Sequence, residues 1–196
     1  MNSRPETLVL ASTSPYRAEL LGRLRLPFEI QRVAIDESSR SSESAAALSQ
    51  RLSIEKAKAL SDFPGDYLSI GSDQVAACDG RLLGKPITEA RARDQLRLIS
   101  GKTVTFYTGV ALWRPRTDSL DCQVVATKVS MRALSDIEIS AYITLDQPLD
   151  CAGSFKWEAL GISLFNATEG PDPTALQGLP LIKLAQMLRD QGYRIP

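Results

Sequence analysis

The sequence contains no histidine, and this absence removes several kinds of chemistry. Without an imidazole, Ser-His-Asp and Cys-His nucleophilic mechanisms are excluded, and so are the usual imidazole metal sites. Any catalysis must therefore use carboxylates, lysine, arginine and hydroxyl groups, with or without a hard metal ion.

Cysteine is also scarce. Cys78, Cys122 and Cys151 are too widely spaced for a zinc knuckle or a CxxC redox pair, and their odd number argues against a disulfide framework. We therefore expect a reducing compartment. Cys151 is a poor candidate for a nucleophile, because no histidine is available to activate it.

Net charge and long apolar runs are absent as well. Lysine plus arginine equals aspartate plus glutamate at 23 each, and no basic arm indicates a protein that tracks along nucleic acid. The apolar runs are far shorter than a membrane span. We therefore expect a cytoplasmic protein that binds neither nucleic acid nor a membrane. Any phosphate that it binds is expected to be carried by a small molecule.

What the sequence does contain is an alternation of strand and helix patterns. The 196 residues are 43% hydrophobic and 23% charged, which is ordinary for a soluble globular protein. No repeat or linker divides the chain, so we predict a single domain over residues 1–196, with one core or two small lobes that share one. The alternation predicts the α/β class.

The hydrophobic periodicity and the turn signals place the individual elements. Strands are predicted at 7–12, 28–35, from 67 onward, at 103–113 and 121–131 as a pair, and near 165; helices are predicted at 15–24, 44–60, 88–100, from 135 onward and at 179–192. Asp79-Gly80 is expected to form a type I′ hairpin turn. The polar segment 36–44 is expected to be a flexible loop.

The stretch "ASTSPYRAELL" carries the first candidate site. Ser14 is a predicted helix N-cap and Pro15 the first helical position, so Arg17 lies in the first turn, beside the positive end of the helix dipole. A bound phosphate would explain this cation, and Ser12 and Ser14 offer hydroxyl groups to the same anion. The alternative is a plain N-cap with Arg17 turned to solvent, at a cost of only about 0.3–1 kcal/mol.

The stretch "GSDQV" carries the second candidate site. Asp73 is predicted at the end of an apolar strand, where a carboxylate could hold a divalent cation or orient a water molecule. Glu37, just after an earlier strand, could share that cation. The alternatives are an aspartate that caps a turn and an ordinary surface acid.

Two lysines lie in structured surroundings. Lys56 lies at the edge of the apolar face of a helix, and Lys85 is fixed between Gly84 and Pro86. Both suit the neutralisation of charge on a polyphosphate, although a solvated lysine remains the alternative for each.

The stretch "CAGSFKWEALG" places Lys156, Trp157 and Glu158 between glycines, as in a recognition loop. A glutamate there could accept hydrogen bonds from the N1–H and the exocyclic amine of a guanine. The alternative is a structural turn anchored by Trp157.

These motifs follow one another in the order "ASTSPYR", "DE", "EKA", "GSDQV", "GKP" and "CAGSFKWEALG". Together they resemble the Maf family of nucleoside triphosphate pyrophosphatases over almost the whole chain, and within it the YceF-type branch, which acts on 7-methyl-GTP. The resemblance implies a Maf/ITPase-like α/β fold, with a mixed sheet flanked by helices and two lobes around a deep substrate cleft. It also implies dependence on a divalent metal cation, Mg²⁺ or Mn²⁺, and hydrolysis of a nucleoside triphosphate to its monophosphate and diphosphate.

The resemblance further implies roles for single residues. Asp73 matches the general base that activates water, and Glu37 matches an acid near the metal. The residues that match phosphate contacts are Ser14, Arg17, Lys56 and Lys85, to which the opening loop adds Ser12. The residues that match the choice of base are Tyr16, Gln74 and Glu158.

One departure from the family pattern is informative. Many members have two arginines after the Ser-Pro pair, whereas here Tyr16 precedes Arg17. An aromatic face suits the cationic base of 7-methyl-GTP better than an arginine does. Two alternatives stay open: the same chemistry on dTTP or UTP, and a non-catalytic nucleotide-binding regulator. The oligomeric state is also open, a homodimer included.

Overall fold

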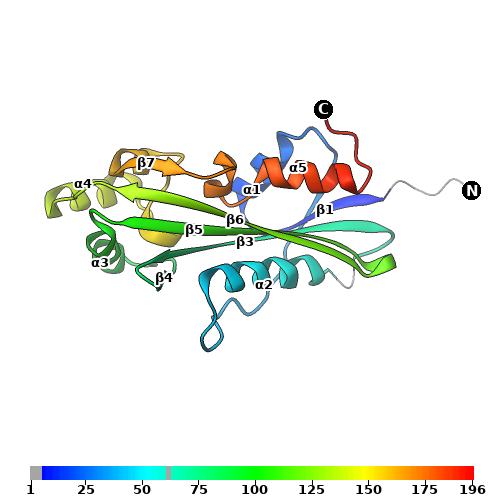
Figure 1. The fold of residues 1–196 in the computed structure, drawn as a ribbon, viewed down its shortest axis with the longest axis horizontal. Coiled ribbons are helices and arrows are strands. Elements are labelled where there is room, and N and C mark those ends of the chain that lie inside the picture. The colour runs from blue at the N-terminus through cyan, green and yellow to red at the C-terminus, as the bar shows by residue number, and fades with distance from the viewer. Residues whose placement is uncertain (1–5, 61–62) are drawn as a thin grey trace, which may run out of the picture. The chain divides into compact units, whose positions relative to one another are not determined.

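The structure is a computed structural model that describes residues 6–60 and 63–196. Its seven-stranded sheet has the order β2-β1-β3-β5-β6-β7, with β4 paired to β3 (Figure 1). The strands are β1 (Thr7–Ala11), β2 (Glu29–Gln31), β3 (Tyr67–Cys78), β4 (Arg81–Leu83), β5 (Thr103–Arg114), β6 (Ser119–Met131) and β7 (Phe165–Glu169). Parallel and antiparallel pairs both occur, so the predicted mixed sheet is confirmed.

The helices of the described residues agree with the sequence pattern. They are α1 (Pro15–Gly22), α2 (Ala45–Lys58), α3 (Glu89–Ile99), α4 (Asp136–Asp146) and α5 (Leu181–Asp190). Short 3₁₀ turns occur at η1 (Pro115–Thr117), η2 (Ala152–Ser154), η3 (Leu160–Leu164) and η4 (Pro173–Gln177). No helix of the described ranges is long and apolar enough to cross a membrane.

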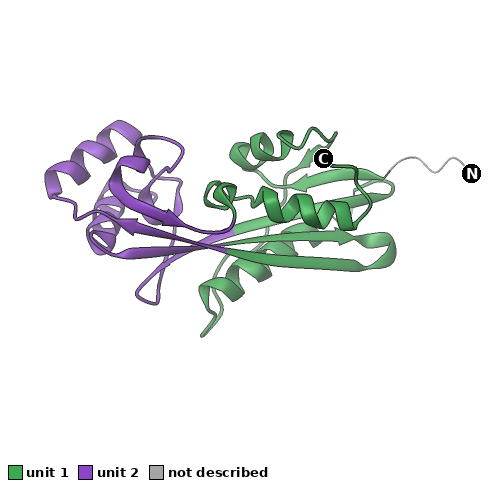
Figure 2. Cartoon of the chain, turned by 45° about the horizontal axis from the view of Figure 1, so that its top comes forward, with its two compact units in different colours: residues 1–73, 108–125, 172–196 green, residues 74–107, 126–171 purple. Residues whose placement is uncertain are grey.

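The chain divides into two compact units (Figure 2). Unit 1 comprises residues 1–73, 108–125 and 172–196, and unit 2 comprises residues 74–107 and 126–171. Strands β3, β5 and β6 each have residues in both units, so each of these three strands continues from one unit into the other.

In unit 1, helices α1 and α5 pack on the same face of the sheet (Figure 1). Their apolar side chains meet those of β1, β3 and β5 in one buried cluster, which includes Leu10, Leu20, Leu21, Ile70, Leu112, Leu184 and Leu188. β1 pairs parallel with both β2 and β3, and residues 12–14 lead from its carboxyl end directly into α1.

Helix α2 covers the opposite face of unit 1 and approaches the sheet very closely. A β-carbon at Gly71 would lie 2.1 Å from the carbonyl oxygen of Ser53, and one at Gly109 would lie 2.4 Å from the Ser53 hydroxyl. The two glycines therefore allow the small side chains of α2 to touch the backbones of β3 and β5. This contact fixes the distance between α2 and the sheet, and therefore also the position of Lys56, which α2 carries.

Several local predictions are confirmed. Ser14 caps α1, Asp79 and Gly80 both have positive φ (49° and 76°) at the β3–β4 turn, and Ser135 forms a capping box with Glu138 at the start of α4. β2 is shorter than predicted, because its pairing with β1 ends at Gln31.

Candidate active site

The loop after β1 is shaped by its own hydroxyl groups. The Ser14 hydroxyl accepts a hydrogen bond from the backbone N–H of Arg17 at 3.4 Å, and the buried Ser12 hydroxyl accepts one from the Ser14 N–H at 3.1 Å. Pro15 begins the helix, so Tyr16 and Arg17 take the second and third helical positions. The predicted phosphate loop therefore has the backbone form that suits an anion at a helix start.

Arg17 is held by a residue far along the chain. Its Nε donates to the carbonyl oxygen of Gly178 at 2.8 Å. Loss of solvent lowers the pKa of its guanidinium, while the negative charges of Asp73 and Glu37 oppose this by raising it. A guanidinium stays protonated in proteins, so Arg17 is a fixed cation whose charge interacts with both carboxylates.

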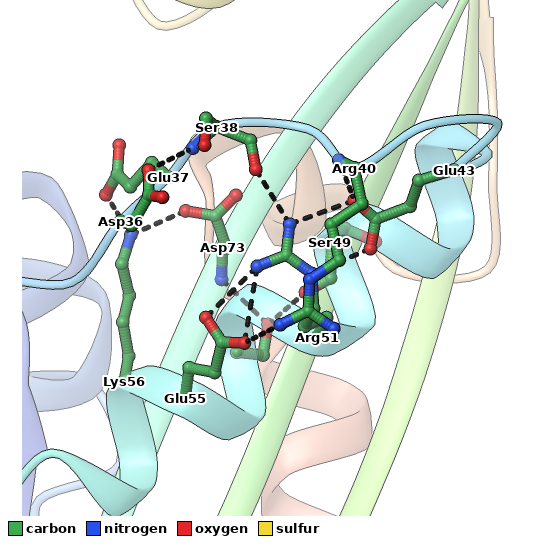
Figure 3. Close-up of polar contacts among 11 residues, drawn as sticks. Asp36, Glu37, Ser38, Arg40, Glu43, Ser49, Arg51, Glu55, Lys56 and Asp73 are labelled. Carbon is green, nitrogen blue, oxygen red and sulfur yellow. Dashed lines mark hydrogen bonds and ion pairs between the residues drawn. The ribbon is translucent and has the colours of Figure 1, made fainter.

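Lys56 joins the two carboxylates. Its Nζ lies 2.5 Å from Asp73 Oδ1 and 2.7 Å from Glu37 Oε1 (Figure 3). The Lys56 and Asp73 side chains are each 10% exposed, whereas the Glu37 side chain is 53% exposed. The buried pair is thus open to solvent on the side of Glu37. The sequence placed Lys56 at the edge of a helix face, and the structure shows it buried against the sheet.

Asp73 lies in the middle of β3, not at a strand end as the sequence predicted. The pairing of β3 with β1 ends at Ile70 and its pairing with β4 begins at Ala76, so residues 71–75 have neither strand beside them. The Asp73 N–H donates instead to the Ser53 hydroxyl at 2.9 Å. This bond replaces a ladder hydrogen bond and lets the strand continue while it carries a functional carboxylate.

Sequence reasoning missed the residues that support the cluster. Ser53 contacts Asp73, Gly178 contacts Arg17, and Ser72 contacts Gly178. Arg51 holds the segment that carries Glu37. A local signal existed for Arg51, since Glu55 is four residues further along the same helix. No local signal marked the others, because their partners lie 20 to 161 positions away.

Three predicted site residues belong to unit 2. Gln74 follows Asp73 directly in β3, Lys85 is exposed after β4, and Glu158 is exposed before η3. The proposed roles of these three residues stay predictions.

The segment around Glu158 is fastened to α4. The backbone N–H of Lys156 donates to the Tyr142 hydroxyl at 3.0 Å, and Lys156 Nζ donates to the carbonyl oxygen of Asp146 at 3.0 Å. Burial raises the pKa of the Tyr142 hydroxyl, which therefore stays protonated at neutral pH. The two hydrogen bonds of Lys156 thus hold the segment next to Glu158 against α4.

The described residues contain no group of three acidic, cysteine or histidine side chains that could hold a metal ion. Glu37 and Asp73 nevertheless present two carboxylates within reach of one ammonium nitrogen. Mg²⁺ is commonly held by one or two carboxylates together with substrate phosphates and water. The donor set therefore fits a cation that is completed by a polyphosphate, and it does not form an all-protein cage.

The site combines a capped helix start, an arginine, a lysine and two carboxylates, near the carboxyl end of a parallel strand pairing in a mixed sheet. This combination is typical of proteins that bind small phosphorylated molecules. The chain belongs to the Maf family, because the family model described as Maf-like protein matches residues 7–191.

Similar proteins cover nearly the full length of this chain. A 7-methyl-GTP pyrophosphatase from Pseudomonas aeruginosa is 54% identical over 189 residues, which are 96% of this chain and 98% of that protein. One of the same name from Xanthomonas axonopodis pv. citri is 52% identical, with 96% and 98% covered. One from Cupriavidus pinatubonensis is 50% identical, with 98% of each chain covered.

Among solved structures, a HAM1 protein from Coxiella burnetii matches with a TM-score of 0.53. It is 14% identical, and the match covers 94% of this chain and 99% of that one. At this identity the likeness supports the fold alone, and it agrees with the expected Maf/ITPase-like architecture.

Proposed function

We propose that this protein is a nucleoside triphosphate pyrophosphatase that hydrolyses 7-methyl-GTP to 7-methyl-GMP and diphosphate. The observation that carries the proposal is the Lys56 ammonium held between Glu37 and Asp73, with Arg17 fixed at the adjacent helix start. The names of relatives that are 50–54% identical over nearly the whole chain support the choice of substrate.

In the proposed reaction the triphosphate lies against the loop of Ser12 and Ser14. Arg17 and Lys56 bind its oxygens, with Lys85 as a further predicted contact. Asp73 orients a water molecule toward the α-phosphorus and accepts its proton as the new P–O bond forms. The bond from the α-phosphorus to the oxygen that bridges it to the β-phosphorus breaks, and diphosphate leaves with that oxygen.

We propose Mg²⁺ or Mn²⁺ as the cofactor, held by Glu37 and Asp73. When bound, such a cation would neutralise phosphate charge in the transition state. Lys56 contacts both carboxylates, so it keeps them together before the substrate arrives. Tyr16, Gln74 and Glu158 are the proposed determinants of the base.

The test is turnover with a panel of nucleotides. Purified protein with Mg²⁺ or Mn²⁺ should release diphosphate from 7-methyl-GTP with a higher kcat/KM than from GTP, dTTP or UTP. Asp73→Asn should lower kcat by orders of magnitude while the fold stays intact, which circular dichroism measures. A preference for dTTP or UTP would support the proposed reaction but contradict the proposed substrate. Binding of 7-methyl-GTP without release of diphosphate would instead favour a non-catalytic regulator.

A further inference from the structure

The segment 36–43, which carries Glu37, has almost no regular structure of its own. It is rich in serine, and its composition alone predicts a flexible loop. The structure shows it fastened to α2 by an ion-pair network that the sequence analysis did not include (Figure 3).

Arg51 is the centre of this network. Its Nε and Nη2 bind both carboxylate oxygens of Glu43 at 2.7 and 2.9 Å, and its Nη1 contacts both oxygens of Glu55 at 3.3 and 3.1 Å. Nη2 also donates to the carbonyl oxygen of Ser38 at 2.9 Å. A guanidinium has five N–H donors, so these five contacts use its full capacity and leave none for a substrate phosphate.

The contact with Ser38 bears directly on Glu37. Asp36 Oδ1 accepts from the Ser38 N–H at 3.0 Å and closes a tight turn around Glu37. Arg51 fixes the carbonyl end of the same turn, and Lys56 binds the Glu37 carboxylate itself. Helix α2 thus holds this turn at its backbone and at its side chain.

The far end of the segment is fixed by the same guanidinium. Glu43 accepts a hydrogen bond from the Arg40 N–H at 3.0 Å, and its side chain is only 9% exposed. The hydrogen bond from Arg51, followed by that from the Arg40 backbone, lowers the pKa of Glu43 to about 2, so this carboxylate stays charged at neutral pH. Both ends of the segment therefore depend on Arg51.

We propose that Arg51 is a positioning residue that sets the location of the Glu37 carboxylate by fixing the turn around it. This inference rests on the proposed function, in which Glu37 acts on the reaction. Arg51 then affects catalysis through Glu37 and without contact to the substrate.

A double-mutant cycle tests this route. We expect Arg51→Gln to lower kcat/KM for 7-methyl-GTP by about tenfold, the lower end of the effect seen when a group that supports a ligand is lost. In a Glu37→Gln background the same change should cost less than about twofold, because the carboxylate to be positioned is already gone.

Arg114 provides the matched control. Its Nε and Nη2 bind both oxygens of Glu6 at 2.6 and 3.0 Å, its side chain is 20% exposed, and it lies in the same unit. Arg114→Gln therefore removes a similar bidentate pair without touching the segment 36–43. Its effect on kcat/KM should be the same in the parent protein and in the Glu37→Gln background. Equal effects of Arg51→Gln in both backgrounds, or wild-type activity of Glu37→Gln, would overturn the proposal.

Amide hydrogen exchange provides a readout that needs no activity. Arg51→Gln should speed exchange at Ser38 and Arg40 at least about tenfold, whereas Arg114→Gln should leave both unchanged. If Arg51→Gln does not fold, Glu43→Gln replaces it as the test variant, because it weakens the ion pair between Arg51 and the segment 36–43. Wild-type protein that releases no diphosphate would contradict the proposed function alone, and unchanged exchange would contradict the role of Arg51.

Discussion

Arg17 and Ser72 meet at one atom, the carbonyl oxygen of Gly178. Arg17 Nε and the Ser72 hydroxyl each lie 2.8 Å from this oxygen, and Ser72 immediately precedes Asp73. This carbonyl oxygen thus contacts both the guanidinium that is proposed to bind phosphate and the strand that carries the proposed base. Gly178 reaches this position with φ of +99°, as the residue that ends η4.

Gly178→Ala should therefore impair catalysis as well as stability. A β-carbon there would lie 3.3 Å from Arg17 Nε and 3.5 Å from its Nη2, so the guanidinium must shift. Because a misplacement of about 1 Å can cost about 100-fold in rate, we expect kcat/KM to fall by about 10- to 100-fold. Steady-state kinetics with 7-methyl-GTP measures this loss.

Gly192→Ala is the control for backbone strain. Gly192 also has positive φ, +91°, but a β-carbon there has nothing within 4 Å. Both variants should lose about 1–3 kcal/mol of unfolding free energy, since both force alanine into the left-handed region. Only Gly178→Ala should lose activity, and equal kinetics for the two variants would contradict the role of Gly178.

Gly71→Ala should destabilise unit 1 and reduce activity. Its β-carbon would lie 2.1 Å from the Ser53 carbonyl oxygen and 2.4 Å from the Ala57 nitrogen, both of which are backbone atoms of α2. The helix must move away, and overpacking of this kind typically costs about 1–3 kcal/mol, occasionally more. Lys56 would move with the helix, so kcat should fall as well. Denaturant unfolding and kinetics measure the two effects.

Gly22→Ala is the matched alanine substitution for this test. Gly22 is the last residue of α1, and a β-carbon there has nothing within 4 Å. Alanine should be neutral or stabilise the protein by about 0.5–1 kcal/mol, because glycine is the poorer helix former. An equal loss of stability in Gly22→Ala and Gly71→Ala would contradict the close contact between α2 and β3.

Glu138 makes stability depend on pH in the acid range. Hydrogen bonds from the Ser135 backbone and side chain, and then from Arg132, lower its pKa from 4.5 to about 2 in the folded protein. The unfolded chain binds the proton more readily, so this contribution is present above about pH 4.5 and is lost as the pH falls toward 2.

Glu138→Gln should therefore flatten the loss of stability on acidification. Glutamine keeps the pattern of a capping box but does not titrate. Urea unfolding from about pH 6 to about pH 3 should show a shallower decline for the variant than for the parent protein. Identical slopes would show that Glu138 is not held as a charged group.

The parts of the fold that the sequence predicted depend on neighbours along the chain. The Ser14 cap, the Asp79-Gly80 turn and the capping box at Ser135 each involve residues within three positions of one another. Such signals act locally, so they can be recognised without knowledge of the tertiary structure.

The surroundings of the candidate site could not be predicted in this way. Burial of Lys56 requires that Gly71 and Gly109 lack side chains, and these residues lie on two different strands. Asp73 stays inside a strand because the Ser53 hydroxyl, 20 positions away, takes its N–H. These contacts exist only after the sheet and α2 have packed together. The motif residues could be named from the sequence, but their partners could not.

Tyr16 provides the sharpest test of substrate choice. It is the second residue of α1 and is half-buried beside Arg17. An aromatic ring can face the cationic base of 7-methyl-GTP, whereas an arginine would repel it. Tyr16→Arg should therefore lower the ratio of kcat/KM for 7-methyl-GTP to that for GTP by about tenfold, which corresponds to about 1.4 kcal/mol. Tyr16→Phe keeps the ring and should keep the ratio. If Tyr16→Arg lowers both rates equally, the loop binds phosphate only, and the choice of base must lie with Gln74 or Glu158.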